Sequence, residues 1–245
     1  MFNYKILIEY DGTDYVGWQS QNNGRSIQNS IEISIEKLIS EKVKIFGAGR
    51  TDAGVHAKGQ VANFFTSKEI SLDTIRDGLN QHLRSDSISI LSAENVNKNF
   101  NARFSAKKRW YEYRVINRRP PLTLENKRAW CVHKQLDIDK IINESKFFLG
   151  KYDFDSFRSV DCQSATSIKT IDFFKITTNG ENIIFTISAK SFLHSQVRIM
   201  VGTLIEIGKG KIKSKELAEI ISSKDRTRAG PTVPAHGLYL MKVKY

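Results

Sequence analysis

The hydrophobic residues of the first 96 positions alternate with a period of two in some segments and recur every three or four positions in others. Ser26, which stands just before the first helical pattern, is a suitable N-cap. The pattern predicts strands at residues 4–10, 43–46, 60–66 and 88–91, and helices at residues 27–40 and 72–83. This order of strand, helix, strand, strand, helix, strand is that of a ferredoxin-like unit.

After a polar, basic stretch at residues 97–108, the chain again mixes the two periods. Strands are expected at residues 110–116, 168–177, 183–189 and 237–243, and helices at residues 138–149, 192–207 and 217–221. Residues 152–160 and 227–236 are expected to form loops. We therefore expect an α+β protein with two ferredoxin-like or RRM-like halves, residues 1–104 and 105–245, built on mixed, mostly antiparallel sheets.

The composition favours a polyanionic partner. The 245 residues include 38 Lys and Arg against 26 Asp and Glu, a formal charge of +12 with a pI near 9.6. A basic protein that is merely soluble fits the charge nearly as well. Two cysteines are too few for a disulfide framework, and the longest apolar run, Ile199 to Ile207, is far shorter than the roughly 20 residues of a membrane span. With no secretory signal apparent at the start, we expect a cytoplasmic protein that does not enter a membrane.

The segment Gly47–Ala57 concentrates three glycines with Arg50, Asp52 and His56 between two predicted strands. Glycines permit tight turns and close approach of a ligand, and a nearby Arg favours the ionised form of an Asp. Asp52 is therefore a candidate for covalent or acid-base chemistry. A Gly-rich turn with a solvated Arg/Asp pair is the alternative.

Three other features allow two interpretations each. The aromatic residues of loop 13–25, among them Trp18, either stack on bases or pin the loop to the core. The aromatic strand 110–116, flanked by Lys107–Arg109 and Arg118–Pro121, suits a nucleic-acid surface or an edge strand with basic flanks. Arg198, among apolar residues, either has an anionic partner or extends to solvent.

The five histidines are scattered without metal-ligand spacing, and GAGRTDAG has neither the Walker ending nor the context of a dinucleotide fingerprint. We therefore expect no metal and no cofactor.

Five segments in order along the chain resemble the tRNA pseudouridine synthase A (TruA) family: YDGTDYVGWQSQ, GRTDAGVHA, FNARFSAKKRWYEYRV, FLHSQVRIMVG and AGPTVPAHGLYL. The resemblance implies an isomerase that converts uridine to pseudouridine in the anticodon stem-loop of tRNA, at tRNA positions 38, 39 and 40, without cofactor or metal. It also implies that the two halves form one catalytic unit, and that two copies form a homodimer.

By the matching motifs, Asp52 is the nucleophile, Arg50 helps to extrude or hold the target nucleotide, Tyr111 stacks on the uracil and assists proton removal, and Arg198 pairs with Asp52. The expected substrate contacts are Tyr111, Gly49, Thr51, His56, Trp18, Gln19, Arg109 and Lys108. The family often has His-Met where this chain has Ser195-Gln196, which puts local packing in question. The alternatives are a pseudouridine synthase for another RNA and a non-catalytic RNA-binding module.

Overall fold

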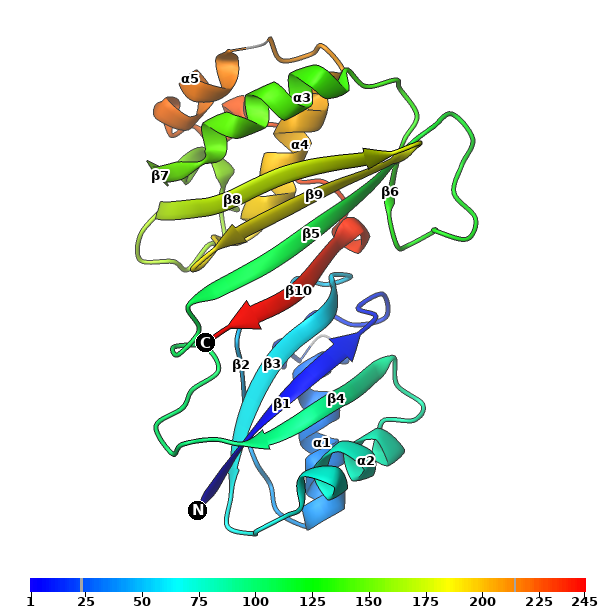
Figure 1. Ribbon diagram of the computed structural model, residues 1–245, viewed down its shortest axis with the longest axis vertical. Helices are drawn as coiled ribbons and strands as arrows, with labels where there is room; N and C mark the ends of the chain where they lie inside the picture. Colours follow the sequence, from blue (N-terminus) through cyan, green and yellow to red (C-terminus); the bar gives the residue numbers. More distant parts are fainter. Residues whose placement is uncertain (23, 214) are drawn as a thin grey trace. The chain divides into compact units, whose positions relative to one another are not determined.

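A computed structural model describes residues 1–22, 24–213 and 215–245, and its described part contains five α-helices and a mixed, mostly antiparallel set of strands (Figure 1). The chain forms two compact units. Unit 1 comprises Met1–Lys107 and Tyr239–Tyr245, and unit 2 comprises Lys108–Leu238. The protein is thus of the α+β class expected from its sequence.

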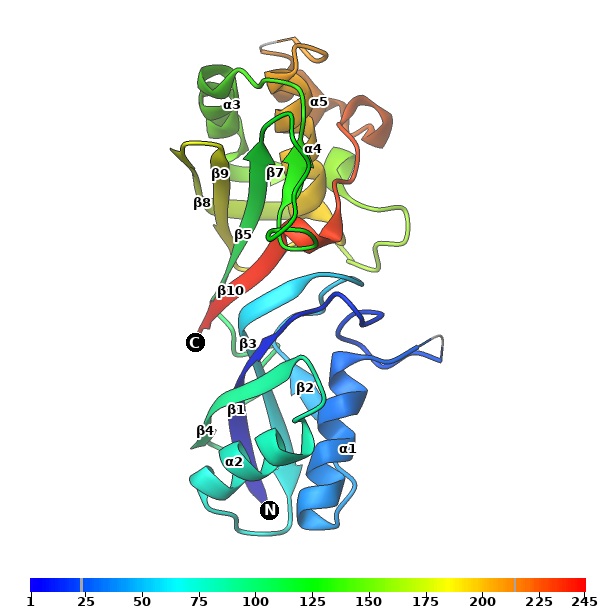
Figure 2. The ribbon, with the colours of Figure 1, turned by 90° about the vertical axis from the view of Figure 1, so that its right-hand side faces the viewer.

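Unit 1 has the predicted element order: β1 (Phe2–Tyr10), α1 (Ile27–Ile39), β2 (Ile45–Gly47), β3 (His56–Thr66), α2 (Leu72–His82) and β4 (Ile88–Asn95). Its sheet runs β4-β1-β3-β10, with β2 added to β3, and β10 (Leu238–Lys244) pairs in parallel with β3. Helices α1 and α2 pack against each other at this sheet (Figure 2).

Local sequence accounts for the start and the buried face of these elements. Tyr4, Ile6 and Ile8, which share one parity of β1, are fully buried. The Ser26 hydroxyl accepts a hydrogen bond from the Asn29 N–H and begins α1, as predicted. Ile33, which falls off the helical stripe, is 43% exposed. In β1 and α1, the hydrophobic period therefore determines which face is buried.

Unit 2 contains β5 (Lys108–Asn117), β6 (Trp130–Val132), α3 (Ile138–Ser145), β7 (Gly150–Asp153), β8 (Ile168–Asn179), β9 (Asn182–Ala189), α4 (Gln196–Gly208) and α5 (Glu216–Ser223). Its sheet runs β5-β9-β8-β7 with antiparallel neighbours, and β6 lies parallel to β5. Helices α3 and α4 pack together, and nearly every residue of α4 is buried.

Several boundaries differ from those expected. Residues 150–153 form the edge strand β7 where part of a loop was expected, and the helix expected over residues 138–149 ends at Ser145 and continues as a short 3-10 turn. Helix α4 begins only at Gln196 because Ser195 has a left-handed backbone (φ 58°), which a helix cannot contain. The final strand joins unit 1, although the chain before it belongs to unit 2.

Candidate active site

Asp52 lies in the loop between the antiparallel strands β2 and β3. It occupies the first position of a β-turn that the Val55 N–H closes on the Asp52 carbonyl at 3.2 Å. Gly54, at the third position, has φ +77°, the conformation that a type II turn requires there. The Asp52 side chain is half-buried, and Arg50 is exposed. The glycine therefore serves the turn that presents the carboxylate.

The start of this loop is fixed to β3. The Ala48 N–H donates to the Val61 carbonyl at 2.7 Å, and the Gln60 side-chain amide donates to the Gly49 carbonyl at 2.8 Å. Gln60 has no exposed surface. A buried amide that bonds a loop carbonyl removes backbone freedom just ahead of Asp52. Sequence reasoning missed Gln60, whose only signal is a polar residue inside the β-prone run QVANFFT.

A second set of contacts holds Thr51, the residue before Asp52. Its carbonyl accepts the Trp18 N–H at 3.0 Å, and its hydroxyl lies 2.8 Å from the Tyr10 hydroxyl. Gly17, with φ +112°, lets the two backbones meet, because a Cβ there would lie 2.6 Å from the Thr51 carbonyl oxygen. Loop 12–18 therefore anchors the residue before Asp52, in addition to the contacts from β3.

Trp18 and His56 are both buried and support this loop. Trp18 is 3% exposed, and its ring lies 6.2 Å from that of Tyr10. His56 is also 3% exposed, and its Nδ1 lies 3.0 Å from the Asp11 carboxylate. Neither ring offers the open face expected of a substrate contact, so the interpretation that loop aromatics pin the loop to the core applies to Trp18. Of the other expected contacts in unit 1, Gln19 is exposed and Gly49 half-buried.

In unit 2, the residues of β5 alternate as predicted. Tyr111 and Tyr113 are buried on one face, while Trp110 and Glu112 are half-buried on the other. The Tyr111 ring meets Phe192 edge to face at 5.3 Å between centroids. Tyr111 retains 8% of its surface, so its ring is held by packing.

Arg198 is half-buried on α4, and its Nε donates to the Val233 carbonyl at 2.8 Å. Burial raises the pKa of Tyr113, and the positive charge of Arg198 opposes part of that rise. Arg198 therefore lies near Tyr113 and is oriented by the loop before β10. Sequence reasoning did not anticipate Val233, because a backbone carbonyl carries no residue-type signal.

A family model described as tRNA pseudouridine synthase matches residues 6–105 and 145–245. Those ranges contain Asp52 and Arg198. The chain belongs to the tRNA pseudouridine synthase family. Tyr111 lies on β5, between the two matched ranges.

Curated relatives of the family match over the whole chain and carry the name tRNA pseudouridine synthase A. They include proteins of Wolbachia pipientis wMel (50% identical, 99% of both chains), Anaplasma phagocytophilum (48%, 99% of both) and Parvibaculum lavamentivorans (46%, 100% of both). Among solved structures, a chain from the crystal structure of a Cbf5-Nop10-Gar1 complex aligns with 96% of this chain and 57% of its own length, at 10% identity and a TM-score of 0.38.

Two cations at the start of β5 have partners within unit 2. Lys108 pairs with Asp172 at 3.1 Å. Arg109 is 8% exposed and donates through Nη1 to the Lys190 carbonyl. The structure therefore gives Arg109 an internal partner, and its role as a substrate contact stays a prediction.

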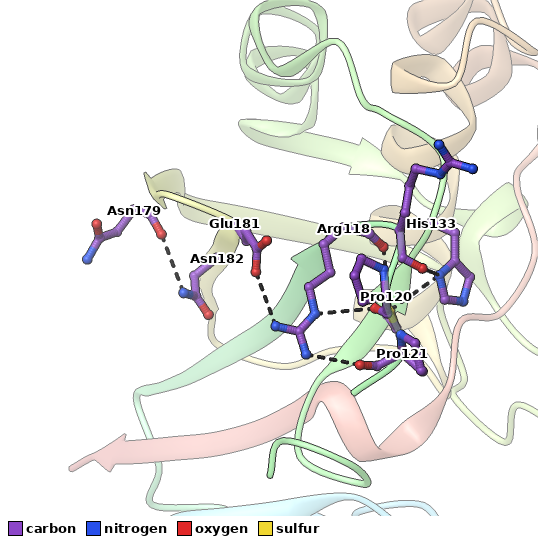
Figure 3. Close-up of polar contacts among 9 residues, drawn as sticks. Arg118, Pro120, Pro121, His133, Asn179, Glu181 and Asn182 are labelled. Atoms are coloured by element: carbon purple, nitrogen blue, oxygen red, sulfur yellow. Dashed lines mark hydrogen bonds and ion pairs between the residues drawn. The ribbon is translucent and has the colours of Figure 1, made fainter. Parts of the chain in front are cut away.

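An open groove of about 660 Å³ lies at the far end of β5, lined by Asn117, Arg118, Arg119, Pro120, Gln135, Ile138, Asp139, Thr178, Gly180, Glu181 and Ile183. Arg118 donates to the carbonyls of Pro120 and Pro121 at 3.3 and 3.0 Å, and lies 3.3 Å from Glu181 (Figure 3). This side chain therefore ties its own turn to the β8–β9 hairpin. Arg119 is exposed.

The structure thus groups the candidate residues by unit. The Asp52 loop, with Arg50 and Thr51, belongs to unit 1, and Tyr111 and Arg198 belong to unit 2. Within the described ranges, no three His, Cys, Asp or Glu side chains are arranged to hold a metal ion, and no helix has the length and hydrophobicity to cross a bilayer.

Proposed function

We propose that the protein isomerises uridine to pseudouridine in tRNA, with the Asp52 carboxylate as nucleophile. The observation that carries the nucleophile assignment is the anchored turn, which presents a half-buried carboxylate beside an exposed Arg50. A carboxylate held in one geometry needs little reorganisation before it attacks. The family and the relatives named tRNA pseudouridine synthase A support the reaction and the substrate.

The reaction moves one bond and one proton. The bond from ribose C1′ to uracil N1 breaks, the base turns, and a bond from C1′ to C5 forms. The C5 proton leaves, and N1 gains a proton, so no atom is lost and no oxidant is required. Asp52 adds transiently to ribose C1′ or to uracil C6, and both routes return the free carboxylate.

The other residues have distinct tasks in this proposal. Tyr111 stacks on the turned uracil, and its hydroxyl assists removal of the C5 proton. Arg50 helps to hold the extruded nucleotide, since extrusion costs a few kcal/mol that pocket contacts must recover. Arg198 is proposed to pair with Asp52 and to stabilise its anion.

The substrate site is proposed to be the anticodon stem-loop, at tRNA positions 38 to 40, and the working form a cytoplasmic homodimer. The support is the resemblance of the five motifs to the TruA family. Sedimentation equilibrium tests the dimer, which should have twice the 27.9 kDa mass of the chain. A single-chain mass at micromolar concentration would contradict it.

The decisive experiment follows tritium released from tRNA labelled at C5 of uridine. The intact protein should release tritium, and Asp52→Asn should release none while its tRNA affinity stays within about tenfold, or roughly 1.4 kcal/mol. Appreciable release by the variant would exclude the nucleophile assignment. Release from ribosomal RNA but not from tRNA would favour the synthase for another RNA, and tRNA binding without release would favour the non-catalytic module.

A further inference from the structure

Two consecutive carbonyls of the loop that precedes β10 accept side-chain donors from different elements of unit 2. The Val233 carbonyl accepts Arg198 Nε at 2.8 Å, and the Pro234 carbonyl accepts the Tyr113 hydroxyl at 2.7 Å. Tyr113 lies on β5 and Arg198 on α4, so the loop joins the two elements. The Val233 carbonyl, which orients Arg198, and the Pro234 carbonyl, which Tyr113 holds, are one peptide unit apart.

The upstream end of this loop is anchored to α4. The Gly230 N–H donates to the Thr203 hydroxyl at 2.8 Å. A Cβ on Gly202 would lie 2.0 Å from the Pro231 carbonyl oxygen, which shows how closely loop and helix approach. These contacts fix the loop ahead of Val233. The Val233 side chain is also buried close to Gly202 of α4, so the remaining freedom of its carbonyl depends on what fixes the chain after it.

Tyr113 is that second anchor. It has no exposed surface, and a Cβ on Gly237 would lie 2.7 Å from its ring, so the ring is packed against the end of the loop. Trp130 meets it edge to face at 6.5 Å. Burial raises the pKa of Tyr113, which keeps the hydroxyl protonated and able to donate at every working pH.

We propose that Tyr113 is a positioning residue for Arg198: its hydroxyl holds the Pro234 carbonyl, and thereby sets the Val233 carbonyl that orients the Arg198 guanidinium. The Nε bond fixes the plane of a rigid, forked donor, so a small shift of Val233 changes where the guanidinium points. The consequence for turnover rests on the proposed function, in which Arg198 pairs with Asp52. The link between Tyr113 and Arg198 itself does not rest on that function.

The test uses Tyr113→Phe in the full chain, which keeps the ring and removes only the hydroxyl. Exchange of the Arg198 Nε–H with solvent, followed by NMR of protein with ¹⁵N-labelled arginine, should become at least about tenfold faster. The single-turnover rate on tRNA should fall about tenfold, with the tRNA dissociation constant changed less than twofold. The matched control is Tyr245→Phe in unit 1, which removes a hydroxyl that bonds the Ala102 carbonyl at 2.9 Å and should change neither quantity.

The same substitution made in the Arg198→Lys variant separates positioning from a general loss of stability. Arg198→Lys has no guanidinium for the Val233 carbonyl to orient, so Tyr113→Phe should cost less than twofold in rate there. An equal cost in both backgrounds, or unchanged Nε–H exchange in Tyr113→Phe, would overturn the proposal. If the wild-type protein released no tritium from tRNA, the proposed function would fail, and the exchange measurement would still decide whether Tyr113 holds Arg198.

Discussion

At the scale of single residues, the candidates divide by burial into groups that can meet a substrate and groups that support them. Asp52 is half-buried and Arg50 exposed, whereas Trp18, His56 and Arg109 are 3%, 3% and 8% exposed. The rings of Trp18 and His56 have little surface left for an RNA base, whereas Tyr111 retains 8% of its surface. Asp52 and Arg50 therefore retain surface that a substrate contact requires.

Tyr111→Phe tests whether the tyrosine is a proton carrier as well as a stacking platform. The change retains the ring that packs on Phe192 and removes only the hydroxyl. Loss of a general acid-base group lowers turnover by on the order of 100-fold, and we expect a loss of that size in tritium release. The tRNA affinity, measured by filter binding, should not change. Wild-type turnover in the variant would make Tyr111 a platform alone.

Arg198→Ala separates pairing with Asp52 from contact with a phosphate. In the proposed mechanism the carboxylate anion of Asp52 attacks, so activity should be lost toward acid pH. Under the proposed pairing of Arg198 with Asp52, removal of the cation should move the acid limb of the pH-rate profile to higher pH. Arg198→Lys should be intermediate because it keeps the charge but not the fork. An unmoved acid limb, together with a slope of log tRNA affinity against log salt concentration that is reduced by about one, would indicate a phosphate contact instead.

At the scale of elements, the Asp52 loop is held because two other segments meet its backbone. Strand β3 bonds Ala48 and Gly49, and loop 12–18 bonds Thr51. The approach of loop 12–18 depends on Gly17, where the positive φ and the 2.6 Å distance to the Thr51 carbonyl both exclude a side chain. Rigidity of the Asp52 loop is thus a property of the packed loops, not of the turn alone.

Gly17→Ala tests this dependence. Positive φ at an alanine costs about 1–3 kcal/mol, and the clash with Thr51 adds to that cost, so the melting temperature should fall by several degrees. Tritium release should fall by more than the loss of folded protein explains, since the clash displaces the residue next to Asp52. The control is Gly180→Ala in the β8–β9 hairpin, where φ is +58° but nothing lies within 4 Å of the added Cβ. Equal effects of the two substitutions on turnover would contradict the role of loop 12–18.

At the scale of the whole molecule, the positive charge is unevenly divided. Unit 2 contains 23 Lys and Arg against 14 Asp and Glu, so it carries a formal charge of +9 out of the chain's +12. Several of its cations pair internally, as Lys108 does with Asp172 and Lys209 with Glu206. The excess over these pairs still gives unit 2 the stronger long-range attraction for a polyanion.

The tRNA affinity should therefore depend steeply on salt. Binding that neutralises several phosphates releases their counterions, so we expect the affinity to fall at least about tenfold between 50 and 200 mM salt. Asp52→Asn should show the same slope as the wild type, because the carboxylate is assigned to chemistry and not to docking. Thermal melts at both salt concentrations control for unfolding. A flat salt dependence would mean that the basic charge does not serve RNA binding.

The order of the elements of unit 1, the cap of α1 and the position of the Asp52 loop could be predicted from the sequence. These depend on residues close in the chain: the period of two or about 3.6, the Ser26 hydroxyl reaching Asn29, and a glycine at the third position of a turn. The five motifs, with no structure, also indicated the family to which the chain belongs.

Packing between distant parts of the chain determines which of the chemically suitable side chains are buried as support, and which unit β10 joins. Those outcomes rest on contacts between distant positions, such as Tyr10 with Thr51, 41 residues apart, and Arg198 with Val233, 35 residues apart. A local pattern shows that a residue can be buried or bonded, but its partner is set by how elements pack. For that reason Gln60, Tyr113 and the Val233 carbonyl, which hold the candidate site, were not evident from the sequence.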